Sequence, residues 1–215
     1  MKKIYAINCS PRKNGNTAVV LESALKGASD AGAETKLIHL CELEFSGCRS
    51  CFACKRKGCA NPGRCALDDA LTPVLEEICD GDGLFIGTPV YFGGETGLCR
   101  NFIERLYFPV LSYDDPSVSL ARKHFPVAFI YTMNVPADIM QKIGYPEKFR
   151  LLPEYAGRMF GGGNAKSLFI CDTWQFDDYA KYHAARFDAT HKAAVRETQF
   201  PQDCEKAYNM GKEMV

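Results

Sequence analysis

The chain has 215 residues, of which 47% are hydrophobic and 24% are charged, the composition of a globular protein with a core of ordinary size. Lysine plus arginine and aspartate plus glutamate both number 26, so the formal net charge is zero. This balance argues against a nucleic-acid partner, because a dedicated nucleic-acid binder carries a strong basic excess. No apolar run approaches the ~20 residues that span a bilayer, so no membrane partner is expected.

The opening segment, MKKIYAINCS, has an apolar stretch shorter than the roughly 7–15 residues of a signal-peptide core, so it indicates a first strand and a cytoplasmic protein. Strand and helix patterns then alternate along the chain. The strands are expected at residues 3–8, 35–40, 83–88, 125–132 and 166–171. The helices are expected at residues 18–31, from Asp68 or Asp69 to about 79, 96–108 and 203–212.

This alternation predicts a parallel sheet with helices on both faces. Five strands at this spacing suit a flavodoxin-like α/β fold, a doubly wound sheet with the strand order 2-1-3-4-5. We therefore expect a single domain over residues 1–215, with loop insertions at residues 109–123 and 172–201. A cysteine-rich loop is expected at about residues 47–66.

The segment CSPRKNGNT lies between the first expected strand and the first expected helix, where an open α/β sheet binds its ligand. Ser10 and Thr17 offer hydroxyls, Asn16 an amide and Arg12 a cation, and the start of the helix offers free backbone N–H groups. Together these groups suit a phosphomonoester. The segment lacks both the Gly-Lys-Ser/Thr of a Walker loop and the GxGxxG dinucleotide fingerprint. The alternative is a polar turn that only caps the helix.

A second segment, TPVYFGGETGLCRNF, follows the third expected strand, which the 2-1-3-4-5 order places beside the first. Pro89 and Gly93 shape a loop that can approach a flat ligand, and Tyr91 and Phe92 offer aromatic surface. The alternative is a loop whose aromatic residues pack on the core.

These two segments, together with RNFIERL on the next helix, resemble the NADPH-dependent FMN reductase and iron–sulfur flavoprotein family of the flavodoxin-like superfamily. The resemblance implies bound FMN. The FMN phosphate would be held by Ser10, Arg12, Asn16 and Thr17. The isoalloxazine ring would be flanked by Pro89, Val90, Tyr91, Phe92 and Gly93. A further flavin contact, after the fourth strand, would come from Thr132 and Met133.

Two functions follow from this resemblance. The first is an FMN-dependent oxidoreductase that takes hydride from NADPH or NADH and passes electrons to a small-molecule acceptor: a quinone, a flavin, an azo or nitro compound, or dioxygen. The alternative is an electron carrier that holds FMN and an iron–sulfur cluster and exchanges electrons with a ferredoxin-like partner protein. Because FMN itself carries the hydride and electron chemistry, no catalytic acid–base residue is expected.

Residues 102–111, FIERLYFPVL, contain more large apolar side chains than a helix can bury against one face of a sheet. Surplus apolar surface indicates a subunit interface, and the resemblance implies the same, so we expect a homodimer or homotetramer. The only tryptophan, Trp174, follows the fifth strand. It is expected to anchor the core or an interface, with a flap over the flavin as the alternative.

The chain has 11 cysteines, five of which fall between Cys48 and Cys65. In a reducing compartment, clustered cysteines more often indicate metal or redox chemistry than disulfides. Cys48, Cys51 and Cys54, followed by Cys59, have the compact spacing of ligands to a 4Fe–4S cluster. The resemblance implies a fourth ligand just before an aspartate pair, which is the place of Cys65, so either Cys59 or Cys65 completes the set. Structural zinc and reactive free thiols are the alternatives.

Overall fold

The computed structural model describes residues 1–59, 62–115, 117–161, 163 and 165–215. Its sheet has five parallel strands in the order β2-β1-β3-β5-β6, which confirms the flavodoxin-like α/β fold. A sixth short strand, β4, pairs antiparallel with β3, and no sequence pattern predicts it. The strands are β1 (Lys3–Asn8), β2 (Glu34–His39), β3 (Gly83–Tyr91), β4 (Gly94–Glu95), β5 (Val127–Thr132) and β6 (Lys166–Ile170).

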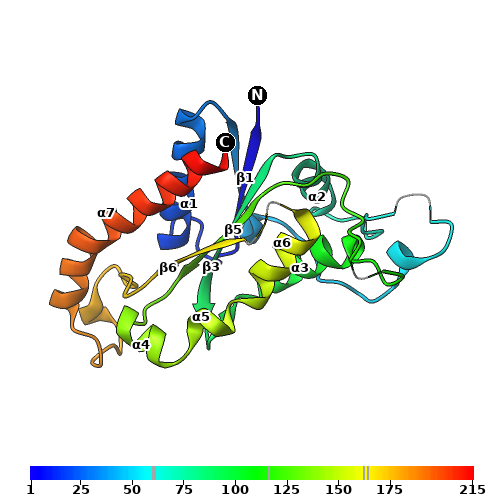
Figure 1. The fold of residues 1–215 in the computed structure, drawn as a ribbon. Coiled ribbons are helices and arrows are strands. Elements are labelled where there is room, and N and C mark those ends of the chain that lie inside the picture. The colour runs from blue at the N-terminus through cyan, green and yellow to red at the C-terminus, as the bar shows by residue number, and fades with distance from the viewer. Residues whose placement is uncertain (60–61, 116, 162, 164) are drawn as a thin grey trace.

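Helices cover both faces of this sheet. Figure 1 shows α1 and α7 on one face and α2, α3 and α6 on the other, with α4 and α5 near the carboxyl ends of the strands. None of the helices in the described part of the chain combines the length and apolar character that a membrane span requires. The helices are α1 (Asn16–Asp30), α2 (Thr72–Cys79), α3 (Gly97–Val110), α4 (Ala137–Lys142), α5 (Tyr145–Lys148), α6 (Leu151–Phe160) and α7 (Ala189–Met214).

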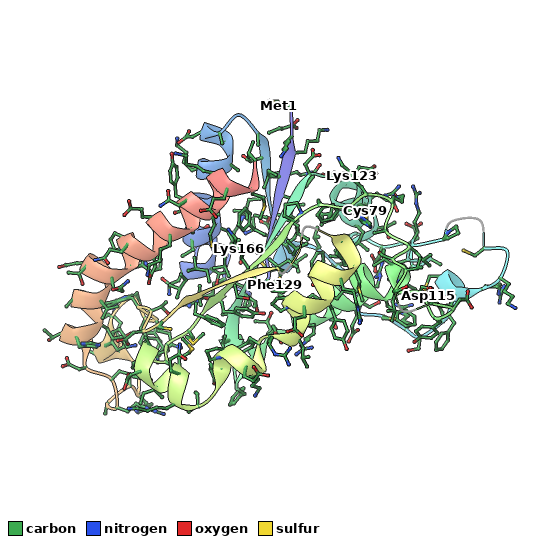
Figure 2. The ribbon with its side chains drawn as sticks, in the orientation of Figure 1. Met1, Cys79, Asp115, Lys123, Phe129 and Lys166 are labelled. Atoms are coloured by element: carbon green, nitrogen blue, oxygen red, sulfur yellow. The ribbon has the colours of Figure 1, made fainter. Side chains whose placement is uncertain are left out.

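The three central strands, β1, β3 and β5, bury both of their faces, as continuous apolar strand sequences predict, whereas the edge strands β2 and β6 are partly exposed. Side chains alternate between two core clusters. Along β3, Leu84 and Ile86 pack with α2, α3 and α6, whereas Phe85 packs with α1 and α7. Figure 2 shows Phe129 of β5 at the centre of the molecule, where it is fully buried in the first cluster. The two clusters hold the sheet rigid beneath the loops at its carboxyl edge.

Helix α7 lies along α1 because two glycines let the helix backbones approach closely. A Cβ atom at Gly211 would lie 1.8 Å from the carbonyl oxygen of Ala24, and one at Gly27 would lie 1.9 Å from that of Tyr208. Any side chain at either position would therefore push the helices apart. This contact places the first half of α7 beside the start of α1 (Figure 1). The segment CSPRKNGNT, residues 9–17, which leads into α1, is called the phosphate loop below.

Some element boundaries differ from the expected ones for identifiable reasons. Helix α7 begins at Ala189 rather than near residue 203 and continues through Pro201, although proline removes one helical hydrogen bond. Packing against α1 maintains the helix on both sides of that position. Strand β3 continues past Thr88 to Tyr91 because its last residues pair with β4. Helices α4, α5 and α6 lie between β5 and β6, where no helix was expected.

Most of the apolar surface that residues 102–111 were expected to leave for a subunit interface is buried within the single chain. Five large apolar side chains of this segment are buried, namely Phe102, Ile103, Leu106, Tyr107 and Val110, whereas Phe108 and Leu111 are half-buried. The sheet is not its only partner, because α6 covers another side: the rings of Tyr107 and Phe160 lie 5.8 Å apart between centroids. The oligomeric state therefore has no support from this helix.

Candidate functional site

The carboxyl ends of β1, β3, β5 and β6 meet at one edge of the sheet, where the segments that follow them enclose a pocket. We call it the edge pocket; its volume is about 70 Å³. All but three of the residues expected to contact FMN line it. They are joined by Asn134, Thr173 and Gln175, which the sequence patterns did not single out. The lining residues are Ser10, Arg12, Asn16, Thr17, Pro89, Val90, Tyr91, Thr132, Asn134, Thr173 and Gln175.

The phosphate loop after β1 presents hydrogen-bond donors to this pocket. The backbone N–H of Ser10 donates to Asn8 Oδ1 at 3.0 Å, and that of Arg12 donates to Ser10 Oγ at 3.1 Å, so the loop is held by its own side chains. Within the described chain, no acceptor takes the backbone N–H of Asn16 or Thr17 at the start of α1. These free N–H groups, at the positive end of a long helix, favour an oxyanion.

Two polar side chains after β5 complete the wall of the edge pocket. Thr132 and Thr17 are both buried, and their Oγ atoms lie 2.8 Å apart. Asn134 Oδ1 is buried and has no hydrogen-bond partner in the described part of the chain. Because a buried acceptor without a partner is costly, this wall fits a ligand that donates a hydrogen bond. Asn134 follows the end of an expected strand by two residues, so the rule that ligands bind beyond the carboxyl ends of strands was sufficient to find it.

The phosphate loop is also connected to the loop after β6. Arg12 Nη1 donates to the carbonyl oxygen of Gln175 at 2.8 Å, and Asn16 Nδ2 donates to that of Trp174 at 2.7 Å. The half-buried Trp174 packs edge-on against Tyr179, with ring centroids 4.9 Å apart. These contacts close the edge pocket on the β6 side.

Three of the expected FMN contacts lie outside the edge pocket. Phe92 and Gly93 form the turn between β3 and β4, with left-handed φ angles of 51° and 72°, as in a type I′ hairpin. This turn directs the Phe92 side chain fully into solvent, whereas Tyr91 beside it lines the pocket. Met133 is buried in the core, because side chains alternate along and just beyond β5, and its side chain does not face the pocket.

A family comparison covers most of the residues that form this pocket. Residues 2–136 match the family model described as NADPH-dependent FMN reductase. The chain belongs to this family. The matched segment contains the phosphate loop, the end of β3, Thr132 and Asn134. The family expected from the sequence is therefore confirmed, and it is a family of oxidoreductases.

Relatives of this FMN reductase family chain include several proteins named iron–sulfur flavoprotein. One from Archaeoglobus fulgidus is 39% identical over 103 residues, which are 48% of this chain and 48% of that protein. Another, from Methanocaldococcus jannaschii, is 33% identical over 103 residues, 48% of this chain and 51% of that protein. The chain therefore spans about half the length of these relatives.

Solved structures of oxidoreductases share the fold over nearly the whole chain. An NAD(P)H:quinone oxidoreductase from Methanothermobacter marburgensis superimposes with a TM-score of 0.72 at 13% identity and covers 100% of this chain and 99% of its own. An FMN-dependent NADH-azoreductase from Bacillus anthracis, solved in complex with FMN, gives a TM-score of 0.63 at 12% identity, with 98% and 100% covered. At such identities the likeness shows the fold alone.

A buried ion pair between α7 and the loop after β6 supports the wall of the edge pocket. Lys192 of α7 is buried; its Nζ donates to the Asp172 carboxylate and, at 3.0 Å, to the carbonyl oxygen of Asn134. His191 Nε2 lies 2.6 Å from the other Asp172 oxygen. Burial raises the pKa of the Asp172 carboxyl, but the hydrogen bonds to Lys192 and His191 outweigh it, and the pKa lies below its ordinary value.

A second site lies at the far end of α3, where the cysteine-rich loop folds back on the helix. Four of its cysteines line one small pocket, which we call the thiol pocket. Arg105 of α3 is fully buried beneath this pocket; its Nε donates to Cys65 Sγ at 2.9 Å, and its Nη1 lies 2.7 Å from Asp69 Oδ2. The cysteines of the thiol pocket are Cys48, Cys51, Cys54 and Cys65.

The remaining cysteine of the loop, Cys59, is absent from the thiol pocket and lines a neighbouring cavity with Cys54 and Cys65. Residues 60 and 61, which follow Cys59, lie outside the described part of the chain. Among the residues that are described, no three His, Cys, Asp or Glu side chains converge as metal ligands do. The cysteines thus surround a common space without forming a closed ligand set.

Lys55 attaches the thiol pocket to α3. Its Nζ donates to the carbonyl oxygens of Phe108 and Leu111 and, at 3.1 Å, to that of Pro109, which are the free carbonyls at the end of α3. The same Nζ lies 4.8 Å from the centroid of the Phe108 ring. The basic residues of the loop are therefore partly used to cap a helix.

Proposed function

We propose that residues 1–215 form a single FMN-binding domain that acts as an oxidoreductase, taking hydride from NADPH or NADH and passing electrons to a small-molecule acceptor. The observation that carries this proposal is the edge pocket, which gathers the phosphate loop, the end of β3 and the segment after β5 at one edge of the sheet. This edge is where open α/β sheets bind their ligands. The family match supports FMN as that ligand.

The donors and acceptors of the edge pocket fit FMN. The free N–H groups of Asn16 and Thr17 and the hydroxyl of Ser10 would donate to its phosphate. Arg12 uses one N–H for Gln175 and keeps the other guanidinium N–H groups for the same phosphate. Asn134 Oδ1, an acceptor without a partner, would take a hydrogen bond from a ribityl hydroxyl or a ring N–H.

The volume of the pocket bears on how FMN would bind. A flavin mononucleotide is larger than a cavity of about 70 Å³, so the edge pocket would hold part of it and the rest would lie at the open side beside Tyr91. Arg12 and Asn16 each donate one hydrogen bond to a backbone carbonyl of the loop after β6. The remaining guanidinium N–H groups of Arg12 would reach the phosphate without breaking its bond to Gln175.

When bound, FMN supplies hydride acceptance and electron transfer. The chain's own residues bind and orient it: the phosphate loop fixes one end, and the segment at residues 89–91 flanks the other. Tyr91 is 45% exposed at the mouth of the pocket. This open side leaves access for a planar acceptor such as a quinone, a free flavin or an azo or nitro compound, and for dioxygen.

The test is anaerobic reduction of the purified, FMN-loaded protein. Addition of NADPH or NADH is expected to bleach the yellow flavin absorbance within seconds to minutes, and a quinone or azo dye is expected to restore it. Protein that binds FMN but is not bleached by either nucleotide would contradict the oxidoreductase proposal.

The thiol pocket favours a second candidate, an electron carrier that holds a 4Fe–4S cluster and exchanges electrons with a ferredoxin-like partner. Cys48, Cys51, Cys54 and Cys65 line one pocket, and four thiolates are the ligand set of such a cluster. The ligand types fit, with Cys65 as the fourth ligand in preference to Cys59, and the four thiols would have to move together around a cluster, since the thiol pocket now measures only about 10 Å³. Bound, the cluster would supply one-electron transfer, and the Arg105 N–H on Cys65 would tune its potential.

Anaerobic purification tests this candidate. Iron and acid-labile sulfide are expected in the wild type and in Cys59→Ala, and neither is expected in Cys65→Ala. Zinc in place of iron indicates a structural zinc site instead. Free thiols with no metal after attempted reconstitution would refute the cluster, and bleaching by reduced ferredoxin alone would favour the carrier over the oxidoreductase.

We also propose a homodimer or homotetramer, on different grounds from the apolar helix. Phe92 is fully exposed at the tip of the β3–β4 hairpin, beside the half-exposed Tyr91. Ile139 and Ile143, in and just after α4, are exposed as well. Exposed apolar side chains near a pocket support an interface there. A monomer by light scattering at micromolar concentration would contradict this proposal.

A further inference from the structure

A second and larger cavity lies on the other side of the phosphate loop, between the start of α1, the loop after β6 and the first half of α7. We call it the outer cavity. Its volume is about 500 Å³, within the range of small-molecule sites. Figure 1 shows these three segments side by side at one end of the molecule. The lining residues are Arg12, Asn14, Gly15, Asn16, Val19, Trp174, Gln175, Phe176, Asp177, Ala193, Arg196 and Glu197.

The outer cavity is distinct from the edge pocket, although they share a wall. The wall is made by the hydrogen bonds from Arg12 to Gln175 and from Asn16 to Trp174. The residues expected to flank the isoalloxazine ring, at 89–91, line only the edge pocket. A ligand in the outer cavity would therefore lie next to a bound flavin without taking its place.

Arg196 of α7 provides a preorganised cation in this cavity. Its Nη1 donates to Asn16 Oδ1 at 3.0 Å, and its guanidinium carbon lies 4.0 Å from the centroid of the Phe200 ring. The two contacts fix the plane of the guanidinium and leave its other N–H groups without an acceptor in the described chain. A fixed guanidinium fork with free donors is suited to phosphate oxygens.

The other walls carry groups that a simple anion would not use. Trp174 and Phe176 offer aromatic faces, and Phe176 is itself held by stacking on Tyr182, with ring centroids 4.4 Å apart. Asp177 and Glu197 are exposed carboxylates, which are acceptors for ribose hydroxyls. An aromatic wall, a guanidinium and carboxylates in one cavity match the three parts of an adenosine phosphate: base, phosphate and ribose.

We propose that the outer cavity binds the adenosine-phosphate half of the nicotinamide dinucleotide reductant. This inference rests on the proposed function, which requires such a dinucleotide to reach the flavin. Since the two cavities share Arg12, Asn16 and Gln175, a dinucleotide anchored in the outer cavity extends over that wall toward the edge pocket. Arg196 is the phosphate-binding residue, and Glu197 accepts from the ribose.

The test uses the FMN-loaded protein, titrated with ADP and with 2′,5′-ADP. Trp174 is the only tryptophan of the chain and lines the cavity, so its fluorescence reports binding directly. Saturable quenching by at least one of the two nucleotides is expected. Arg196→Ala is expected to weaken that binding about tenfold or more, as for loss of a hydrogen bond to a charged group. Arg158→Ala, a change on α6 outside the cavity, is expected to leave it unchanged.

A second variant keeps the test decisive if Arg196→Ala disturbs α7. Ala193→Leu would place a larger side chain in the cavity while leaving the polar groups of its walls intact, and it is expected to block the quenching. Absence of quenching by both nucleotides in the wild type, or quenching that survives Ala193→Leu, would overturn the proposal. Flavin that is still bleached by NADPH or NADH in that case would show that this inference alone has failed and that the proposed function stands.

Discussion

The Nζ atom of Lys192 in α7 donates a hydrogen bond to the carbonyl oxygen of Asn134, 3.0 Å away in the loop after β5. The same Nζ contacts the carboxylate of Asp172, the second residue after β6. Asp172 has a left-handed φ of 56°, an unusual conformation for a residue other than glycine. One buried lysine thus connects the two loops that carry Asn134 and Thr173 into the edge pocket.

Lys192→Met is expected to reduce the free energy of unfolding by about 3 kcal/mol or more, because it leaves the Asp172 carboxylate without its buried partner. It should also weaken FMN binding, because it releases the carbonyl of Asn134. The measurements are urea unfolding and FMN titration. Lys181→Met removes an exposed lysine whose ion pairs are 3.7 Å and longer, and it is expected to change stability by less than about 0.5 kcal/mol. Equal effects of the two changes would contradict the role given to Lys192.

The lowered pKa of Asp172 gives a pH dependence. The folded-state pKa lies below the unfolded value of about 3.9, so the stabilisation is fully present above that unfolded value and is lost as the pH falls through the folded pKa. Wild-type stability should therefore fall more steeply below about pH 5 than that of Asp172→Asn. Asp68→Asn, which alters an exposed aspartate, is expected to keep the wild-type slope. If the free energy of unfolding falls equally steeply with pH in the wild type and in Asp172→Asn, the Asp172 carboxylate contributes nothing to the acid dependence of stability.

The close contact of α1 and α7 makes Gly211 intolerant of a side chain. Gly211→Ala would place a Cβ atom 1.8 Å from the carbonyl oxygen of Ala24, and it is expected to destabilise the protein by about 1–3 kcal/mol. Gly97→Ala is the matched control, since no atom lies within 4 Å of a Cβ there. Gly97 is the first residue of α3, where interior helix propensity does not apply, so this change is expected to alter stability by less than about 0.5 kcal/mol. Thermal or urea unfolding should therefore shift for Gly211→Ala and stay near the wild type for Gly97→Ala. Similar behaviour of both would mean that the helices separate without cost.

Local sequence patterns were sufficient to predict the strands and the residues that line the edge pocket after β1 and β3. The part of the pocket wall formed by the loop after β6 depends on long-range packing. Strand β1 matches its expected bounds because KIYAIN is a short run with an apolar centre, the pattern of a strand that is buried on both faces of a parallel sheet. The sequence predicts Trp174 as an anchor or a flap, but it does not predict the contacts of Trp174 and Gln175 with the phosphate loop, because only the folded chain brings their carbonyls to Asn16 and Arg12.

Two further differences have the same origin. Helix α7 extends through Pro201 because glycine contacts with α1 support it, and no local propensity indicates that support. The apolar side of α3 has a second intrachain partner in α6, a helix that was not among the expected elements although Pro153, Ala156, Met159 and Phe160 form a buried stripe along it. The sequence does not predict a role for Arg105, because an arginine within an apolar helix has no recognisable function by itself. Its position beneath the thiol pocket is defined by its contacts with Cys65 and Asp69.

The proposed FMN site depends on the phosphate loop, and the ratio of riboflavin to FMN dissociation constants measures directly what this loop contributes. Riboflavin lacks only the phosphate, so the ratio isolates the contribution of Ser10, Arg12, Asn16 and Thr17. The wild type is expected to prefer FMN by about 100-fold or more, as for several charge-assisted hydrogen bonds. Arg12→Ala combined with Thr17→Ala is expected to reduce that preference at least about tenfold, mainly by weakening FMN. If the double variant loses FMN and riboflavin equally, the edge pocket does not bind FMN through this loop.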